Sequence, residues 1–385
     1  MVCRDTYRRT ILKSKTNMTE NIKMKRFFTC SVLAATLFFA VASPSRSEDR
    51  AEQDLAEQYK LTAERIRNNY DSNYVRLATY AQNHYAVRMY RLTGEAYYAQ
   101  QSGAEVYQIT DRLNMYADNL SNSKWREQQA QKMIDRLSNT RRSKLRKKTL
   151  QGTGDKRFAL YLIYQMAKLN EYGLKHPAHE QFVNYLKHAD LHDFMMSADF
   201  IHAYAAQVAN YVYWLKYIGV VDWTGDLRSA FENAYPDDKD DQLSKNQFNN
   251  KLYGLTHIVL ADSNYYQQMV SKEKHAWILD YFEKRQQRIE EKSKEDIQAE
   301  IGLCYLLAGL NDHPTLAAMQ REINDAVDPE KNMVLSISGS DSLSYGEHRN
   351  VLAYALLNWP KKLHQGPFLL EDKKMKASLP LVYQQ

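Results

Sequence analysis

Glycine, proline and cysteine are all scarce in this chain of 385 residues, with 13, 8 and 3 copies. Few glycines and prolines leave few helix breakers, and alternating β-branched runs are missing apart from the short segment 333–338. Apolar residues instead recur with the period of about 3.6 residues that is typical of amphipathic helices. The sequence therefore predicts an all-α fold.

Several sequence signatures of well-known chemistry are also missing. The chain has no Gly-rich phosphate loop, no G-x-S-x-G elbow, no HExxH pattern and no CxxC pair. The acidic run 237–241 lacks the glycine and glutamate that an EF-hand loop needs, so we interpret it as a solvated acidic turn. No motif therefore identifies a reaction or a ligand.

The first 42 residues differ in composition from the rest. A basic start at Met24-Lys25-Arg26 leads into an apolar stretch, and small residues at Ala40 and Ala42 fit an A-x-A cleavage site. This pattern predicts a signal peptide over residues 1–42, in which 1–23 are a long n-region or follow a misplaced start codon. The apolar core is shorter than the ~20 residues that span a bilayer, although an uncleaved anchor is the alternative. We expect a periplasmic or secreted protein without a transmembrane segment after cleavage.

The net charge of +6 belongs to this leader. Residues 1–42 hold eight Lys/Arg and two acids, so the residues after Ala42 hold 44 basic and 44 acidic side chains. A neutral mature chain has no global basic field, and we predict no nucleic-acid partner. The local basic cluster 141–148 could meet phosphates or lipid head groups, but a solvated helix end explains it more simply. Cys304 is the one cysteine after the leader, which excludes a disulfide within the mature chain.

After the leader, the pattern predicts an N-terminal helical segment over 43–150, an α/α-hairpin domain over 151–360 and a C-terminal tail over 361–385. In the hairpin domain, apolar helices alternate with polar ones such as 272–292, and successive apolar starts are about 40 to 55 residues apart. Two helices and two turns fit that spacing, so we expect stacked or closed α-hairpins. The apolar helices are expected to begin near Lys156, Met195, Asn250, Asp296 and Glu347.

This alternation of inner and outer helices resembles α/α toroids, the architecture of many polysaccharide lyases, inverting glycosidases and protein prenyltransferase β subunits. The segments 252–257 (LYGLTH), 296–304 (DIQAEIGLC) and 347–350 (EHRN) resemble a bacterial family known as domain of unknown function 3541. That resemblance implies an exported helical protein and supplies no activity. Prenyltransferases bind zinc through Asp and Cys two residues apart, whereas Asp296 and Cys304 are eight apart, so that zinc chemistry is not implied.

Three polar residues of the predicted inner helices, His257, Glu300 and His348, are the candidate catalytic residues. Two imidazoles and a carboxylate can carry out acid–base catalysis without a metal. They could also ligate a zinc ion with an open position, or be ordinary buried residues with local partners. We predict no cofactor and keep zinc as the alternative.

The expected helix starts give a test of whether these three residues meet. Ser244, Ser293 and Ser344 each precede Gln, Asp or Glu by three residues, as in a capping box. Counted from these caps, the three candidates differ by nine helical positions, or about 13 Å along the axis, which excludes a shared ion. If Asn250 caps its helix instead, His257 moves closer to the level of the others and the side chains can converge.

Five further residues are candidates for substrate binding. Arg349 and Asn350 lie in a predicted first turn, where they could hold a carboxylate or sugar hydroxyls, or pin a loop. Tyr345 stands just before them. Asp199 and His202 are three residues apart on a helix, so they could form a base with its orienting acid or simply pair with each other.

Together these features predict an exported helical protein that acts on or binds an envelope or extracellular carbohydrate or peptide. If it is an enzyme, a carbohydrate lyase or hydrolase is expected. The alternative is a non-catalytic binding or assembly protein of the bacterial envelope. Its 28 tyrosines suit contacts with another envelope component as well as sugar stacking.

Overall fold

The computed structural model describes residues 46–384, of which those from Arg50 onward belong to one compact unit. The predicted signal peptide lies outside the described residues. Helices dominate the described part of the chain, and the only strands there are two short ones, so the predicted all-α fold is confirmed. None of the helices described is long and apolar enough to cross a membrane.

The helices and strands follow one another along the chain in this order: α1 (Arg46–Ser72), η1 (Tyr74–Arg76), α2 (Thr79–Thr93), α3 (Ala96–Gln101), α4 (Gly103–Asn119), α5 (Ser123–Asp135), α6 (Arg141–Leu150), α7 (Lys156–Glu171), α8 (His179–Lys187), α9 (His192–Met196), α10 (Ala198–Tyr217), α11 (Thr224–Ala234), η2 (Asp237–Gln242), α12 (Lys245–Asp262), α13 (Lys272–Lys284), α14 (Gln286–Lys292), α15 (Glu295–Leu307), α16 (Pro314–Asp325), β1 (Val327–Asp328), β2 (Met333–Val334), α17 (Leu343–Leu357), α18 (Lys373–Ala377) and η3 (Leu381–Tyr383). The two strands pair antiparallel, with Val327 opposite Val334.

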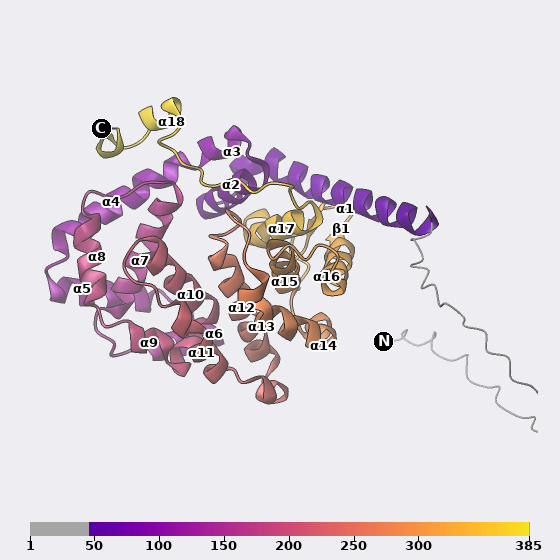
Figure 1. The fold of residues 1–385 in the computed structure, drawn as a ribbon. Helices are drawn as coiled ribbons and strands as arrows, with labels where there is room; N and C mark the ends of the chain where they lie inside the picture. The colour runs from indigo at the N-terminus through magenta and orange to yellow at the C-terminus, as the bar shows by residue number, and fades with distance from the viewer. Residues whose placement is uncertain (1–45, 385) are drawn as a thin grey trace, which may run out of the picture. The chain divides into compact units, whose positions relative to one another are not determined.

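Six helices form an inner layer. Each contacts the next in the order α7, α10, α12, α15, α17 and α2, and Figure 1 shows them around the middle of the unit. Outer helices pack on them, with α5 and α8 against α7, α11 against α10, α13 against α12 and α16 against α15. Arg91 of α2 also pairs with Glu171 of α7. The alternation of inner and outer helices is as predicted, while closure into a toroid stays a prediction.

Two glycines allow the inner helices to pack closely against their neighbours. A Cβ atom on Gly254 of α12 would lie 2.3 Å from the Phe231 ring of α11. A Cβ on Gly302 of α15 would lie 2.5 Å from the Leu356 side chain of α17. Glycine inside a helix costs roughly 0.5–1 kcal/mol relative to alanine, so its presence here is explained by these contacts.

One of the three predicted capping boxes is confirmed. Ser244 accepts the Gln247 N–H, and the Gln247 side chain in turn accepts the Ser244 N–H at the start of α12. The other two predictions are wrong. Ser293 ends the preceding helix by donating its hydroxyl proton to a carbonyl of α14. Ser344 lies inside α17, where its hydroxyl accepts the Ala78 N–H, because α17 begins earlier than its apolar pattern indicates.

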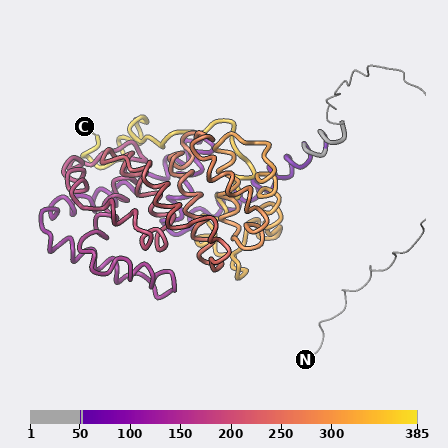
Figure 2. The backbone as a smooth tube through the Cα atoms, turned by 60° about the horizontal axis from the view of Figure 1, so that its bottom comes forward, coloured from indigo at the N-terminus to yellow at the C-terminus, as the bar shows by residue number. Residues whose placement is uncertain are grey.

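The N-terminal segment and the C-terminal tail pack within the same unit as the hairpins. Helix α2 contacts α17, which is the inner helix that comes last along the chain. The tail, yellow in Figure 2, is held to the ends of α2 and α7 by three hydrogen bonds. The His364 N–H donates to the Arg91 carbonyl, the Arg91 Nε–H donates to the Gly366 carbonyl, and the Leu369 N–H donates to the Tyr172 carbonyl.

Candidate functional site

Each inner helix carries a polar stripe whose members are three or four residues apart. Such spacing places the members on one face of a helix. Most other positions in the middle of these helices are buried and apolar. The stripes comprise Tyr80, His84 and Arg88 on α2; Arg157, Tyr161, Tyr164 and Lys168 on α7; Gln207, Asn210 and Trp214 on α10; Asn250, Tyr253 and His257 on α12; Asp296 and Glu300 on α15; and Tyr345 and His348 on α17.

The three candidate catalytic residues meet at one carboxylate oxygen. Glu300 is 0% exposed, and its Oε1 lies 3.6 Å from His257 Nε2 and 3.8 Å from His348 Nε2. The Thr256 hydroxyl donates to the other oxygen, Oε2, at 2.6 Å. Within the described residues, Oε1 has no hydrogen-bond partner. A buried acceptor without a donor costs about 1–3 kcal/mol, so this arrangement needs an explanation beyond folding.

The predicted separation of about 13 Å along the helix axes is therefore wrong for these three residues. Ser244 does cap α12, yet His257 still reaches Glu300. Counting from the caps assumes that all inner helices begin at the same level. Helix α12 begins at Lys245, twelve residues before His257, whereas α15 begins at Glu295, five residues before Glu300. The start of α12 therefore lies about two turns before the start of α15, and residues at different positions in their own helices lie side by side.

His257 is held through its Nδ1 atom, which lies 3.0 Å from the Asn210 side-chain oxygen and 3.1 Å from the Tyr265 hydroxyl. The Tyr265 hydroxyl donates its one proton to the same Asn210 oxygen at 2.5 Å. Nδ1 is therefore the donor to Asn210, and Nε2 of the neutral ring is a free base. When Nε2 takes a proton, the resulting imidazolium faces the Glu300 carboxylate at 3.6 Å.

Glu300 and His348 shift each other's pKa values. Burial raises the pKa of Glu300, but His257, His348 and the Thr256 hydrogen bond outweigh this and leave the pKa below its usual range. Partial desolvation by the surrounding helices and the neighbouring His84 lower the pKa of His348, against the opposing effect of Glu300. His348 is thus neutral at neutral pH. Its side chain is 45% exposed, which makes it the most accessible member of the cluster.

A second pair, His84 and Glu347, adjoins this cluster. The His84 and His348 rings are 5.4 Å apart, and His84 Nδ1 lies 2.9 and 3.0 Å from the two Glu347 carboxyl oxygens. Burial raises the pKa of Glu347 to about 8, and burial together with Arg88 and Lys168 lowers the pKa of His84 well below its usual range. Both shifts favour a neutral pair in which the Glu347 carboxyl donates its proton to His84 Nδ1.

His84 is not among the predicted site residues, and the capping role predicted for Glu347 is wrong. His84 lies in the segment 43–150, outside the predicted hairpin domain. The signal that could have found it is the stripe Tyr80, His84 and Arg88, one residue per turn of α2. Glu347 lies in the second turn of α17 and turns toward His84.

Two of the candidate binding residues in 345–350 hydrogen-bond to strand β2, and one faces solvent. The Asn350 amide accepts the Val334 N–H at 2.7 Å and donates to the Val334 and Gly346 carbonyls, which are the contacts of the loop-pinning alternative. Arg349 also donates to the Val334 carbonyl, at 3.3 Å. Tyr345 is 85% exposed. Of these three candidates, Tyr345 has a side chain that is largely free to meet a ligand.

Asp199 and His202 are not brought to the cluster. The His202 Nε2–H donates to the Ala234 carbonyl at 2.7 Å, and its ring packs edge-on against Tyr235. These contacts direct the imidazole toward the end of α11. Asp199 is exposed in the first turn of α10, and no bond joins it to His202 within the described residues.

The basic cluster 141–148 is only partly a solvated helix end. Arg142 donates to Asn250 at 3.3 Å, and Arg146 donates to Gln207 at 2.8 Å, so both contact polar stripes of inner helices. Burial and the neighbouring Arg142 lower the pKa of Arg146 to about 10. The prediction that the whole cluster is solvated is therefore wrong for Arg146, whose charge lies against α10.

No group of three or more His, Cys, Asp or Glu side chains in the described part of the chain is placed to hold a metal ion. Cys304 lies near the cluster but is fully buried, and burial raises the pKa of its thiol well above the usual range. Asp296 accepts the Tyr253 hydroxyl proton. We refer to His257, Glu300 and His348 as the Glu300 cluster.

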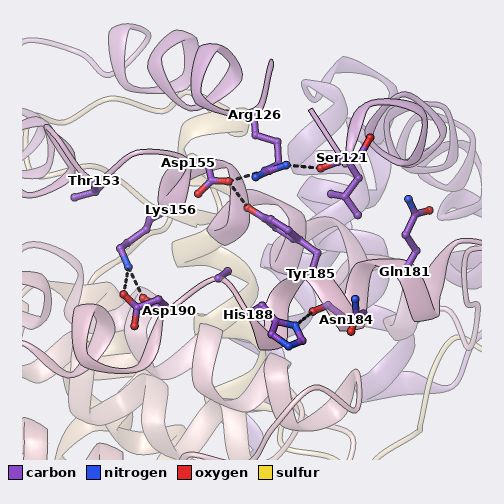
Figure 3. A pocket seen from close by; sticks show the side chains of 12 residues that line it. Ser121, Arg126, Thr153, Asp155, Lys156, Gln181, Asn184, Tyr185, His188 and Asp190 are labelled. Carbon is purple, nitrogen blue, oxygen red and sulfur yellow. Dashed lines mark hydrogen bonds and ion pairs between the residues drawn. The ribbon is translucent and has the colours of Figure 1, made fainter. Parts of the chain in front are cut away.

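A separate hollow of about 630 Å³ lies where α5, α7 and α8 come together (Figure 3). Its charged side chains are engaged with one another. Arg126 Nε donates to Asp155 at 2.6 Å, the Tyr185 hydroxyl donates to the same carboxylate at 2.9 Å, and Lys156 pairs with Asp190. With its charges paired in this way, the hollow is a weaker candidate for chemistry than the Glu300 cluster.

Comparison with known proteins supports the motif resemblance. The sequence profile of Domain of unknown function (DUF3541) matches residues 59–385, which include every residue of the cluster. No curated protein and no solved structure matches the chain. Because the match covers most of the sequence, the predicted family is confirmed, and the chain is a member of the DUF3541 family.

Proposed function

We propose that this protein is an exported enzyme that cleaves an envelope or extracellular carbohydrate by acid–base catalysis at His257, Glu300 and His348. The observation that supports this most directly is the Glu300 carboxylate. It is fully buried, one oxygen has no hydrogen-bond partner within the described residues, and that oxygen lies within 4 Å of two imidazoles. Buried polar groups are almost always satisfied in folded proteins, and a catalytic role is one explanation for an exception.

The roles follow from accessibility and charge. His348 is the general base, because its ring is accessible and its lowered pKa keeps it neutral. Once His348 takes a proton, the Glu300 carboxylate at 3.8 Å stabilises the imidazolium. His257, on the other side of the same carboxylate, is the general acid that protonates the leaving oxygen. Glycosidic bond cleavage by elimination or by hydrolysis needs one such base and one such acid.

Two exposed tyrosines flank the proposed site and support a sugar ligand. Tyr345 precedes His348 by three residues and is 85% exposed, and Tyr80 precedes His84 by four and is 60% exposed. The Tyr80 hydroxyl donates to the Ser344 carbonyl, which ties the two segments together. Tyrosine rings stack on the apolar faces of sugars while their hydroxyls stay in water. The same two rings also suit the alternative, a binding or assembly protein without catalysis.

The export step of the proposal rests on the leader pattern in residues 1–42. The mature chain is expected to begin near Ser43 and to be recovered from the periplasm or the medium. Fractionation of expressing cells, with N-terminal sequencing of the recovered protein, tests this. Recovery of the full-length chain in the cytoplasm would contradict it.

The catalytic step is tested with the mature protein on a panel of bacterial and extracellular polysaccharides. New reducing ends report cleavage, and ultraviolet absorbance of an unsaturated product separates elimination from hydrolysis. We expect Glu300→Gln and His348→Ala to remove turnover while leaving binding of the same polysaccharide intact. His188→Ala is the matched control, because His188 is exposed and, within residues 46–384, its side chain bonds only to the Asn184 carbonyl. Binding without any turnover in the wild type would favour the non-catalytic alternative.

A further inference from the structure

One buried cation beside the proposed site lacks a hydrogen-bond partner among the described residues. Arg88 lies one turn along α2 from His84 and is 6% exposed, and its Nη1 atom is buried without an acceptor in that part of the chain. Its central carbon lies 4.5 Å from the centre of the Tyr265 ring and 5.6 Å from that of Tyr266. The ring faces offset only part of the cost of burying a charge, so a further anionic partner is expected.

Arg88, Arg91 and Lys168 all act on the Glu171 carboxylate. Its Oε2 already accepts Arg91 Nη2 at 3.2 Å and Lys168 Nζ at 3.3 Å. Burial lowers the pKa of Lys168, but Glu171 and Glu105 outweigh this and leave that pKa raised, so Lys168 is well matched by carboxylates. Arg88 is the cation of this group without a direct carboxylate partner among the described residues. The field of these cations reaches the site, since Arg88 and Lys168 both lower the pKa of His84.

An aromatic row begins one helical turn from Lys168. Tyr164 stacks on Tyr161 with ring centres 5.8 Å apart, and it lies 5.8 Å from Trp214 of α10. All three rings are partly accessible. Rows of accessible aromatic rings suit the flat faces of sugar units better than a flexible peptide backbone.

We propose that the ligand is an acidic carbohydrate, and that its carboxylate or sulfate group binds between Arg88 and Lys168 while its sugar rings lie against Tyr164 and Trp214. This inference rests on the proposed carbohydrate function and adds the charge of the substrate. An oxyanion at this position supplies the hydrogen-bond acceptor that Arg88 Nη1 lacks.

The test is a calorimetric titration of the mature protein with D-glucuronate, D-glucose 6-sulfate and neutral D-glucose at matched ionic strength. We expect the acidic sugars to bind at least ten times more tightly than glucose. Arg88→Gln and Lys168→Gln should each weaken the acidic sugars about ten-fold and leave glucose unchanged. Lys168 is partly accessible, so Lys168→Gln keeps the test valid if Arg88→Gln fails to fold. Arg126→Gln, which removes a cation from the separate hollow of Figure 3, is the control and should bind like the wild type.

Tighter binding of glucuronate alone identifies a carboxylate ligand, and tighter binding of the sulfate alone identifies a sulfated one. The inference is overturned if glucose binds as tightly as the acidic sugars, if no acidic sugar binds, or if neither substitution weakens them. Glu300→Gln and His348→Ala separate the two proposals. Unchanged turnover in those variants together with intact anion selectivity would reject the enzyme and keep the acidic ligand.

Discussion

Glu300 and Asp240 are both fully buried carboxylates, but their surroundings differ. Asp240 accepts Lys251 Nζ at 2.7 Å, the Tyr281 hydroxyl at 2.8 Å and Arg285 Nε at 3.1 Å. Glu300 has one short donor, Thr256, and an oxygen that only faces imidazoles at 3.6 and 3.8 Å. A buried carboxylate that holds helices together has hydrogen-bond donors on both oxygens. A carboxylate with a catalytic role is expected to have one oxygen without a donor in the free protein.

The same comparison corrects the interpretation of the acidic run 237–241. It is a short 3₁₀ helix whose fourth residue, Asp240, is fully buried, so it is not simply a solvated turn. The donors that make this possible, Lys251 and Arg285, come from α12 and from the end of α13. They are distant in sequence from the acidic run, which therefore looks unpaired when taken alone.

The largest expected effect is on turnover. Glu300→Gln should lower the turnover of the cleaved polysaccharide about 10³-fold, because an amide cannot stabilise the His348 imidazolium. The free energy of unfolding should change by no more than about 1–2 kcal/mol, since Gln keeps an acceptor for Thr256. Initial rates and urea unfolding measure the two quantities. Asp240→Asn is the paired control, and a comparable loss of turnover in that variant would break the distinction.

The second expected effect is on stability, and it should be larger for Asp240 than for Glu300. Asp240→Asn removes the charge that Lys251 and Arg285 share, and Lys251 is itself nearly fully buried. Loss of one partner from a buried ion pair costs about 3–5 kcal/mol, and we expect the lower end because Asp237 still pairs with Lys251. Urea denaturation measures this cost. A loss below about 1 kcal/mol would show that Asp240 is not the structural anchor we describe.

Much of the fold could be predicted from the sequence. Helical periodicity gave the all-α class, and the expected inner-helix start at Lys156 is where α7 begins. The start expected near Asp296 is one residue from that of α15, and the others differ by three to five residues. Periodicity arises because one face of each helix is buried, so it can be recognised in the sequence even when the neighbouring helices are unknown.

The candidate site was predicted in part. His257, Glu300 and His348 stood out because a polar residue on an apolar helix is unusual, and the structure brings them together. His84 and Arg88 were missed because they lie in the segment 43–150, far along the chain from the hairpin domain in which the site was expected. The offset of each helix along the axis of its neighbour depends on packing and loop geometry, and the positions of helix caps in the sequence do not reveal that offset. This is why the count from Ser244 placed His257 too deep.

The third expected effect concerns pH and Glu347. Burial raises the pKa of Glu347 from about 4.5 to about 8, so the folded state binds an extra proton between these values. The resulting stabilisation is fully present below about pH 4.5 and is lost as the pH rises through 8. Glu347→Gln resembles the protonated acid and cannot ionise. From about pH 5 to pH 8.5 we expect the wild type to lose about 1–3 kcal/mol of unfolding free energy relative to Glu347→Gln. Parallel pH profiles of the two proteins in urea unfolding would contradict this.

The smallest effect removes one hydroxyl donor from each buried carboxylate. Thr256→Val and Tyr281→Phe each delete a hydrogen bond, of 2.6 Å to Glu300 and 2.8 Å to Asp240, and each should cost about 1 kcal/mol of stability. Their effects on activity should differ. The Thr256 hydroxyl helps to keep the pKa of Glu300 low, so Thr256→Val should move the acidic limb of the turnover profile to higher pH. Tyr281→Phe should leave that limb in place, because Asp240 belongs to the scaffold and Glu300 to the site. Equal shifts in both variants would mean that the two carboxylates do not differ in role.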